Sequence, residues 1–162
     1  PQFHVRPSSN WINDPNGPFY DPMHKKYHLF NQYNPFGSSW GHMSWSHSVS
    51  SDLVHWERLP VALWPNQSYD ASGVFSGSVT LVGGNPVISY TCVGPGGQLQ
   101  CLARPSNRSD PNLVEWSKDS RNPVIAAAPP GGNTKSFRDD TTAWQDAAGG
   151  AWSMAVGAAI NG

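Results

Sequence analysis

The chain has 162 residues, enough for one domain with a hydrophobic core, and its 10 basic and 11 acidic residues leave a net charge of −1. Because it carries no basic stripe, nucleic acid and anionic membranes are poor partners, and no apolar run approaches the ~18 residues of a membrane span. Charged residues make up only 13%, while 16 Gly, 15 Pro and 8 Trp are typical of many short strands joined by tight turns.

The first marked feature of the chain is the stretch Trp-Ile-Asn-Asp-Pro-Asn-Gly at residues 11–17. It predicts a tight turn, because Pro15 presets φ for the second turn position and Asn-Gly tolerates the positive φ that follows. Asp14, immediately before the turn, has a simple interpretation as an Asx-turn carboxylate that accepts hydrogen bonds from nearby backbone. A functional interpretation depends on the rest of the chain.

The remainder of the chain predicts strands, since no window of a dozen residues keeps an apolar helical period with caps. Asn-Pro, Gly-Gly, Pro-Gly and Pro-Pro pairs separate the strand-like runs. The predicted strands are 26–33, 43–49, 74–81, 86–92, 99–103, 137–144 and 151–156. The sequence therefore predicts an all-β fold. Trp45, Trp56, Trp116 and Trp144 are expected to lie in strands and to belong to the core.

Two features bear on the cellular compartment. The chain begins at Pro1 inside sequence that already has the character of a folded domain, so we expect the natural N-terminus to lie upstream. The triplets Asn66-Gln67-Ser68 and Asn107-Arg108-Ser109 are glycosylation sequons. Such triplets also arise by chance, and they fit passage through a secretory pathway.

The two cysteines flank a predicted hairpin turn. Cys92 and Cys101 lie on either side of Gly-Pro-Gly-Gly at 94–97, so they are expected in adjacent strands. Whether they form a disulfide depends on the strand register, which the sequence leaves open. Of the two alternatives, we favour unbridged thiols.

The strand pattern repeats with a period just above sixty residues. Leu-Val-His-Trp at 53–56 recurs as Leu-Val-Glu-Trp at 113–116, and Pro-Val-Ala at 60–62 recurs as Pro-Val-Ile at 123–125. About four short strands per period is typical of the blades of a β-propeller. Because ordinary blades have ~40–50 residues, these blades are expected to carry long loops.

A polar residue opens each repeat. Asp14 is followed 62 residues later by Ser76, and Ser76 is followed 63 residues later by Asp139. Equivalent positions at the start of successive blades line the axis of a propeller, so the three side chains are expected to meet at one funnel mouth. The chain holds two such blades and part of a third, whereas propellers close with ~4–8 blades, so we expect it to be a piece of a larger protein.

Two carboxylates across one pocket are the groups that glycosidases use. Arg138 would keep the adjacent Asp139 ionised, which suits an electrostatic partner rather than an acid. Asp139 and Asp140 lack the further oxygen ligands of a cation site, and the six His lack zinc-type spacing, so no metal or other cofactor is predicted. The other candidates are hydrogen-bonding groups for sugar hydroxyls, Asn13, Gln32, Ser76 and Arg138, and flat apolar faces, Trp11, Trp40 and Phe75.

Several motifs resemble, in order and spacing, those of glycoside hydrolase family 32, the invertases, fructan exohydrolases, inulinases and related fructosyltransferases. They are Trp-Ile-Asn-Asp-Pro-Asn-Gly at 11–17, Phe-Ser-Gly-Ser at 75–78 and Phe-Arg-Asp at 137–139, with plant-type Tyr-Asn-Pro at 33–35, Trp-Gly at 40–41 and Ser-Ser-Asp-Leu-Val-His-Trp at 50–56. The family has a five-bladed propeller followed by a β-sandwich. The resemblance implies that residues 1–162 form the N-terminal part of the propeller, truncated at both ends, with about two and a half blades.

The resemblance also implies residue roles. Asp14 matches the nucleophile that attacks C2 of a β-fructofuranoside, and Asp139 matches the carboxylate that stabilises the transition state. The matching positions that shape the fructosyl pocket are Asn13, Gln32, Trp40, Ser76 and Arg138. One departure is Asp140, where the family usually has Pro, so that the loop loses the rigidity of Pro.

The second departure concerns the general acid, which in the family is a Glu in a Trp-Glu-Cys motif. Glu57 and Glu115 are the two glutamates of the chain, and neither lies in such a motif. We therefore expect the acid beyond Gly162 and expect the 162 residues alone to be inactive.

The function implied by the resemblance is a secreted or vacuolar β-fructofuranosidase that acts on sucrose or fructan with retention. Two alternatives stay open. A fructosyltransferase would use a sugar hydroxyl in place of water, and a non-catalytic sugar-binding propeller would fit the unusual Asp140. The sequence leaves the oligomeric state open.

Overall fold

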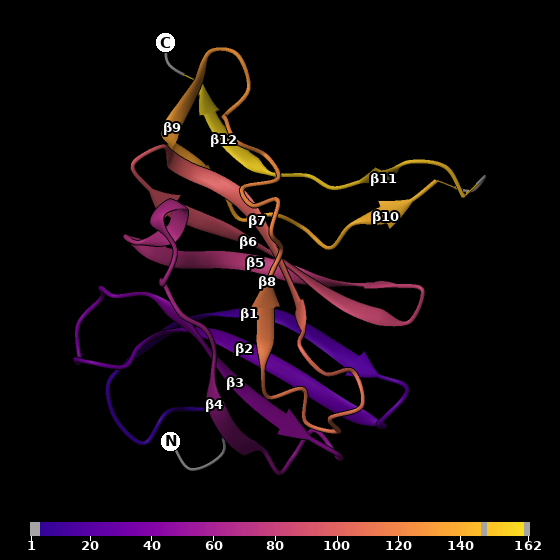
Figure 1. Ribbon diagram of the computed structural model, residues 1–162. Coiled ribbons are helices and arrows are strands. Elements are labelled where there is room, and N and C mark those ends of the chain that lie inside the picture. The colour runs from indigo at the N-terminus through magenta and orange to yellow at the C-terminus, as the bar shows by residue number, and fades with distance from the viewer. Residues whose placement is uncertain (1–3, 147–148, 161–162) are drawn as a thin grey trace.

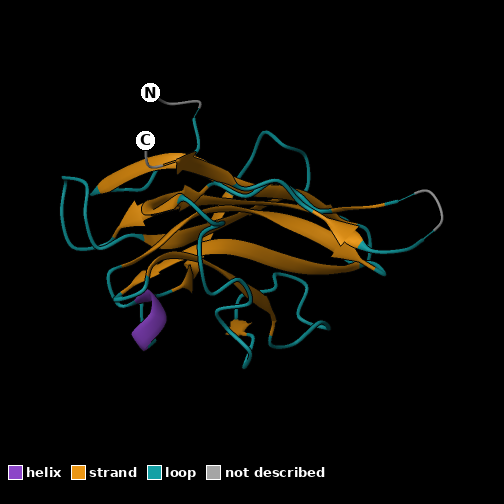
Figure 2. Ribbon diagram, turned by 90° about the horizontal axis from the view of Figure 1, so that it is seen from above, coloured by secondary structure: helices purple, strands orange, loops and turns teal. Residues whose placement is uncertain are grey.

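The computed structural model describes residues 4–146 and 149–160 and is all-β in these residues, apart from one short helical turn, η1 (Ser68–Asp70). Two four-stranded antiparallel sheets dominate. Figures 1 and 2 show the arrangement of the strands in two views. The first sheet has the order β1 (Trp11–Asp21), β2 (Lys26–Asn34), β3 (Ser44–Ser50) and β4 (Glu57–Leu63), and the second has the order β5 (Gly73–Val82), β6 (Asn85–Gly94), β7 (Gly97–Pro105) and β8 (Trp116–Lys118). In both sheets, neighbours in sequence are neighbours in space, as in a propeller blade.

The C-terminal part of the chain forms a third, smaller unit, drawn from orange to yellow in Figure 1. β9 (Gly132–Arg138) pairs with β12 (Gly157–Ile160), and β10 (Trp144–Gln145) pairs with β11 (Trp152–Ser153), in both cases antiparallel. The Thr141 amide donates to the Ala155 carbonyl at 2.9 Å between these two pairs. Together they make one irregular hairpin.

Four strands, β1, β4, β8 and β12, lie outside the predicted ranges, and the reason for β1 is informative. The stretch 11–17 is not a tight turn but lies inside β1, which pairs with β2. Pairing shifts register between Asn13 and Pro15 and again between Asn16 and Phe19, and Gly17 has a φ of 47°. Since β1 is at the edge of its sheet, it tolerates the missing amide of Pro, and the bulges absorb the turn-forming residues.

The repeat predicted from the sequence has a backbone counterpart. Leu53 and Leu113, the first residues of the two Leu-Val repeats, both adopt a left-handed backbone conformation, with φ of 65° and 47°. The two Trp residues that end these repeats, Trp56 and Trp116, were both predicted to lie in strands, but they differ in the structure. Trp116 begins β8 and is buried, whereas Trp56 is half-buried and precedes β4.

The main core lies between the two four-stranded sheets. Phe30 and Trp45 from the first sheet are fully buried, and the Phe30 ring contacts Trp116 of the second sheet edge-on, with centroids 5.6 Å apart. Trp45 and Trp116 therefore fit the predicted core. Trp144 does not, since it is 53% exposed in the thin C-terminal hairpin, where no second layer of the described residues covers it.

The prediction of unbridged thiols is wrong, because Cys92 and Cys101 form a disulfide. Cys92 pairs in register with Leu99, and Tyr90 pairs with Cys101, so the cysteines are diagonal neighbours on the same face of β6 and β7. Their Cα atoms are 5.9 Å apart, within the range for a bridge.

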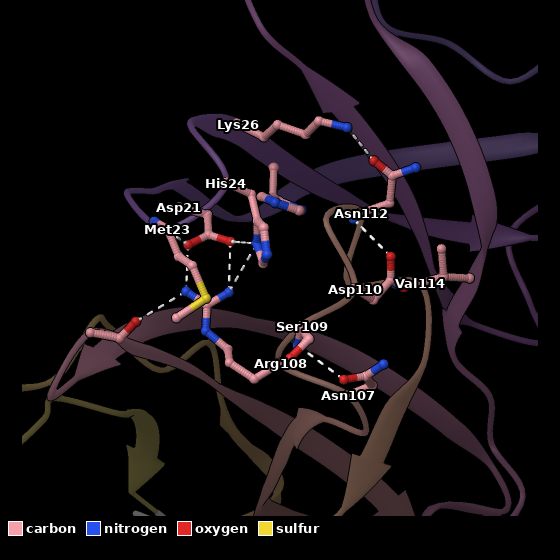
Figure 3. Close-up of polar contacts among 12 residues, drawn as sticks. Asp21, Met23, His24, Lys26, Asn107, Arg108, Ser109, Asp110, Asn112 and Val114 are labelled. Carbon is pink, nitrogen blue, oxygen red and sulfur yellow. Dashed lines mark hydrogen bonds and ion pairs between the residues drawn. The ribbon is translucent and has the colours of Figure 1, made fainter.

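A polar network joins the two sheets (Figure 3). Asp21, at the end of β1, is fully buried, and its carboxylate accepts two hydrogen bonds from Arg108, at 2.5 and 2.7 Å, in the loop between β7 and β8. His24 lies 2.7 Å from the same carboxylate, and Lys26 donates to Asn112. Burial would raise the pKa of Asp21, but these hydrogen bonds, led by Arg108, lower it well below its ordinary value.

No helix within the described ranges is long and apolar enough to span a bilayer.

Candidate functional site

The three polar residues that open the repeats lie around one cavity of about 440 Å³. Asp14 comes from β1 and Ser76 from β5, and the Ser76 hydroxyl donates to Asp14 Oδ2 at 2.9 Å. Asp139 follows the last residue of β9. The cavity is lined by Asn13, Asp14, Gln32, Trp40, Phe75, Ser76, Arg138 and Asp139, which are eight of the nine residues selected from the sequence.

The ninth residue, Trp11, does not line the cavity but contacts Asn13, which does. Its indole Nε1–H donates to Asn13 Oδ1 at 2.7 Å. Because this bond occupies the amide oxygen, the NH₂ group of Asn13 remains as the donor toward Asp14. Burial would raise the pKa of Asp14, but side-chain hydrogen bonds from Ser76 and Asn13 outweigh it, so the pKa lies below its ordinary value. Asp14 is therefore an ionised, oriented carboxylate in a partly open cavity.

Asp139 is held by its backbone and by its neighbour. It adopts a left-handed conformation with φ of 63°, and its amide donates to Thr91 Oγ1 at 3.3 Å. Arg138 Nε lies 3.5 Å from Asp139 Oδ2, and the Arg138 guanidinium also donates to Gln98 Oε1 at 3.3 Å. The Arg138 cation therefore lies beside this carboxylate and helps to fix its orientation.

The walls of the cavity suit a polyhydroxylated ligand. Gln32 is only 2% exposed, and its Nε2 has no hydrogen-bond partner in the structure. A buried donor without a partner on a cavity wall is costly and is satisfied when a ligand hydroxyl accepts from it. Trp40 is 59% exposed and meets Phe75 edge-on at 5.7 Å, which leaves aromatic surface for the C–H face of a sugar.

A second cavity, of about 340 Å³, adjoins the first and shares Asp14, Ser76 and Asp139 with it. It adds Asn16 and Asp140, both buried, and both with a side-chain atom that lacks a partner: Asn16 Nδ2 and Asp140 Oδ1. Neither was selected from the sequence as a site residue. Asn16 lies inside the motif at 11–17, so the motif contained the signal, whereas the burial of Asp140 depends on contacts that sequence spacing does not reveal.

Other chemistry at this cavity is limited by the residues present. Glu57 begins β4 and Glu115 precedes β8, both are exposed, and neither lines either cavity. Within residues 4–146 and 149–160, no group of three or more His, Cys, Asp or Glu side chains is placed to hold a metal ion. The arrangement thus offers one oriented carboxylate, one carboxylate paired with Arg, and donors and aromatic faces for a sugar.

Comparison with known proteins gives close relatives. The chain is 49% identical to acid beta-fructofuranosidase 1, vacuolar, of a Rosa hybrid cultivar, over 98% of this chain and 27% of that protein. It is also 49% identical to beta-fructofuranosidase, insoluble isoenzyme 4, of Oryza sativa subsp. japonica, over 99% of this chain and 27% of the relative. A sucrose:sucrose 1-fructosyltransferase of Festuca arundinacea is 46% identical over 96% of this chain and 24% of its own length. The chain thus spans about a quarter of the length of these relatives.

Solved structures agree with the sequence comparison. Fructan 1-exohydrolase IIa from Cichorium intybus superposes with a TM-score of 0.92 at 42% identity, over 98% of this chain and 29% of that one. A variant of the same chicory protein, solved in complex with 1-kestose, gives a TM-score of 0.91 at 42% identity, over 98% of this chain and 30% of that one. The family described as glycosyl hydrolases family 32 N-terminal domain matches residues 4–162. The chain therefore belongs to glycosyl hydrolase family 32 and lies within the N-terminal domain of that family.

Proposed function

We propose that the protein is a β-fructofuranosidase that hydrolyses sucrose or a fructan with retention of configuration. The observation that carries the proposal is the cavity lined both by Asp14, which accepts a hydrogen bond from Ser76, and by Asp139, which lies beside Arg138. The named relatives, acid and insoluble beta-fructofuranosidases and a fructan exohydrolase, support the same class of substrate.

In the proposed reaction, the Asp14 carboxylate attacks C2 of the fructosyl unit as the bond from C2 to the leaving oxygen breaks. A general acid protonates that oxygen, and the fructosyl unit remains as an ester on Asp14. Water then attacks C2, gives its proton to the same residue acting as a base, and releases fructose with its original anomeric configuration. The acid is a residue other than Glu57 and Glu115, since both lie away from the cavity.

Asp139 and its neighbours act on charge and orientation. The Asp139 carboxylate accepts hydrogen bonds from fructosyl hydroxyls and stabilises the positive charge that develops at C2 in the transition state. Gln32 Nε2 and the side chains of Asn13 and Ser76 fix the position of the fructosyl ring, while Trp40 and Phe75 cover its apolar face. These contacts bring C2 within reach of Asp14.

We further propose that the two four-stranded sheets are consecutive blades of a five-bladed propeller and that the C-terminal hairpin begins a third. The repeat of 60–63 residues and the superposition on about 29% of the chicory chain support this assignment. In a propeller, the first strand of each blade lies nearest the axis. Asp14 and Ser76 lie near the start of β1 and β5, the first strands of the two proposed blades.

The test is the product pattern of the full-length protein. With sucrose alone, we expect glucose and fructose in equal amounts, with fructose released first as the β-anomer. A transferase, which the fescue relative makes the second candidate, would instead give more glucose than free fructose and build longer fructosyl products, especially with added acceptor. Binding of sucrose without any turnover would contradict both and favour a sugar-binding propeller.

A secreted or vacuolar location is proposed from the names of the relatives and from two sequons. Asn66 and Asn107 are both exposed. After expression in a eukaryotic secretory host, we expect peptide N-glycosidase to lower the mass of the protein. Asn66→Gln and Asn107→Gln should each remove one part of this shift, because each variant removes one acceptor. A secreted protein whose mass does not change on this treatment would contradict the use of these sequons.

A further inference from the structure

Asp140 is the buried carboxyl closest in sequence to the candidate site, and the proposed reaction does not use it. It is 4% exposed and lies next to Asp139. Its Oδ2 accepts a hydrogen bond from the Ser89 hydroxyl, and its backbone carbonyl accepts one from Ser78 Oγ at 2.7 Å. Its other carboxyl oxygen, Oδ1, is buried without a partner. A buried oxygen of this kind calls for an explanation.

The carboxyl of Asp140 lies directly behind the strand that carries Ser76. A Cβ added to Gly77 would lie 2.9 Å from Asp140 Oδ1 and 2.1 Å from the Ser89 carbonyl, so only a glycine lets the carboxyl approach β5 this closely. Ser76, one residue earlier, is the residue that donates to Asp14. Asp140 is therefore packed between the backbone of Ser76–Gly77 on one side and the left-handed bend at Asp139 on the other.

The groups that face Asp140 come from its own segment, from the strands packed against it and from the second cavity. From β5 and β6 these are the uncharged Ser78 and Ser89, from its own segment the Asp139 carboxylate, and across the second cavity Asp14. The nearest cation in sequence, Arg138, contacts Asp139. Burial, together with the charge of Asp139, raises the pKa of Asp140 to about 6, although the Ser89 hydrogen bond works in the opposite direction.

We propose that Asp140 is a positioning residue whose neutral carboxyl keeps Ser76–Gly77 and the Asp139 bend in their working arrangement, and whose ionisation in less acidic solution turns the pocket off. This inference rests on the proposed function of the pocket. An ionised Asp140 would be a buried charge with a single side-chain donor, and it would be the third negative charge around the two cavities. Repulsion from this charge would then displace the Asp14 and Asp139 carboxylates from the arrangement that the reaction needs.

The first test is the dependence of kcat on pH for the full-length protein with sucrose, between pH 4 and pH 8. Asp140→Asn keeps a neutral group of the same shape, and Asp140→Pro introduces the residue usual in the family. In both variants we expect the alkaline fall of kcat to move upward by about one pH unit, because the fall that remains reports only the general acid. Asp52→Asn is the matched control, since Asp52 lies in the loop between β3 and β4 with a pKa already well below its ordinary value.

The shape of the profile, rather than its height, is the readout, because a merely structural role would lower kcat equally at every pH. Alkaline limbs that superpose for the wild type and both Asp140 variants would overturn the proposal. A shift of the same size in Asp52→Asn would overturn it as well, since the effect would then not be specific to Asp140.

The second test is the melting temperature as a function of pH, which does not depend on activity. The folded-state pKa of Asp140 is raised above its unfolded value, so the stabilisation that it contributes is complete below about pH 4 and is lost as pH rises through about 6. We expect the melting temperature of the wild type, relative to Asp140→Asn, to fall across this window. A difference in melting temperature between the wild type and Asp140→Asn that stays constant with pH would overturn the proposal about Asp140. Failure of the protein to hydrolyse any β-fructoside would instead refute the proposed function and leave this test valid.

Discussion

Replacement of Asp14 by Asn in the full-length protein is expected to reduce kcat on sucrose by at least about 10³-fold, as loss of a catalytic nucleophile does in other enzymes. The carboxamide has the same shape as the carboxylate, but it is a far weaker nucleophile and cannot form the fructosyl ester. The Ser76 hydroxyl can still donate to the remaining oxygen, so the cavity should keep its form and its affinity for sugar. Steady-state kinetics, sucrose binding and thermal unfolding of the same preparation measure the three effects.

A graded companion variant separates the role of the carboxylate from that of its surroundings. The 2.9 Å hydrogen bond from Ser76 lowers the pKa of Asp14. Ser76→Ala removes this bond but leaves the nucleophile in place. A hydrogen bond to a charged group contributes about 1.5–3 kcal/mol, so a reduction of roughly 10- to 100-fold is expected. Turnover of Asp14→Asn at the wild-type rate would exclude Asp14 as the nucleophile. A larger loss in Ser76→Ala than in Asp14→Asn would point to Ser76 instead.

The meeting of the three candidate site positions was predictable from the sequence because it follows from chain periodicity. Asp14, Ser76 and Asp139 recur at 62 and 63 residues, and a repeated four-stranded unit returns the chain to the same end of the next sheet after each period. The structure accordingly brings all three residues to one cavity. This prediction needed neither the strand boundaries nor the register.

Features that depend on register or on burial were not predictable in the same way. The turn-forming Pro15 and Gly17 gave the expectation of a turn, whereas edge position and two bulges keep them in β1. The disulfide required the diagonal pairing of Cys92 and Cys101, which a shift of one residue would abolish.

A third such feature is a pair of histidines in the core. His28 and His47 lie with Nδ1 and Nε2 2.9 Å apart on adjacent strands, and both are buried. Burial lowers the pKa of His28 to about 4 and that of His47 well below its ordinary value, so both are neutral. Their spacing of 19 residues in the sequence carries no pattern that would indicate this contact.

The second large effect is expected at the Arg108–Asp21 ion pair, which joins the two sheets and lines neither of the two candidate cavities. Arg108→Ala should lower the free energy of unfolding of the protein at pH 7 by about 3–5 kcal/mol, because it leaves the fully buried Asp21 carboxylate without its main partner. Arg104→Ala is the matched control. It breaks the Arg104–Asp119 pair, which has a similar distance of 2.7 Å, but the Arg104 side chain is 47% exposed, so a loss below about 1 kcal/mol is expected.

A second substitution tests whether the unpaired Asp21 carboxylate causes the loss of stability. Asp21→Asn in the Arg108→Ala background should recover a large part of the lost stability, because the carboxamide is neutral and its oxygen still accepts from the Met23 amide. The pKa of Asp21 is lowered by folding, so the stabilisation from this pair is complete above the ordinary range for Asp and is lost as pH falls through and below it. The difference between the wild type and Arg108→Ala should therefore shrink as pH falls below about 4. Chemical denaturation measures the free energy of unfolding of each variant. A loss in Arg108→Ala no larger than that in Arg104→Ala would contradict this prediction. It would mean that the apolar core around Phe30 and Trp116, rather than the buried ion pair, holds the two sheets together.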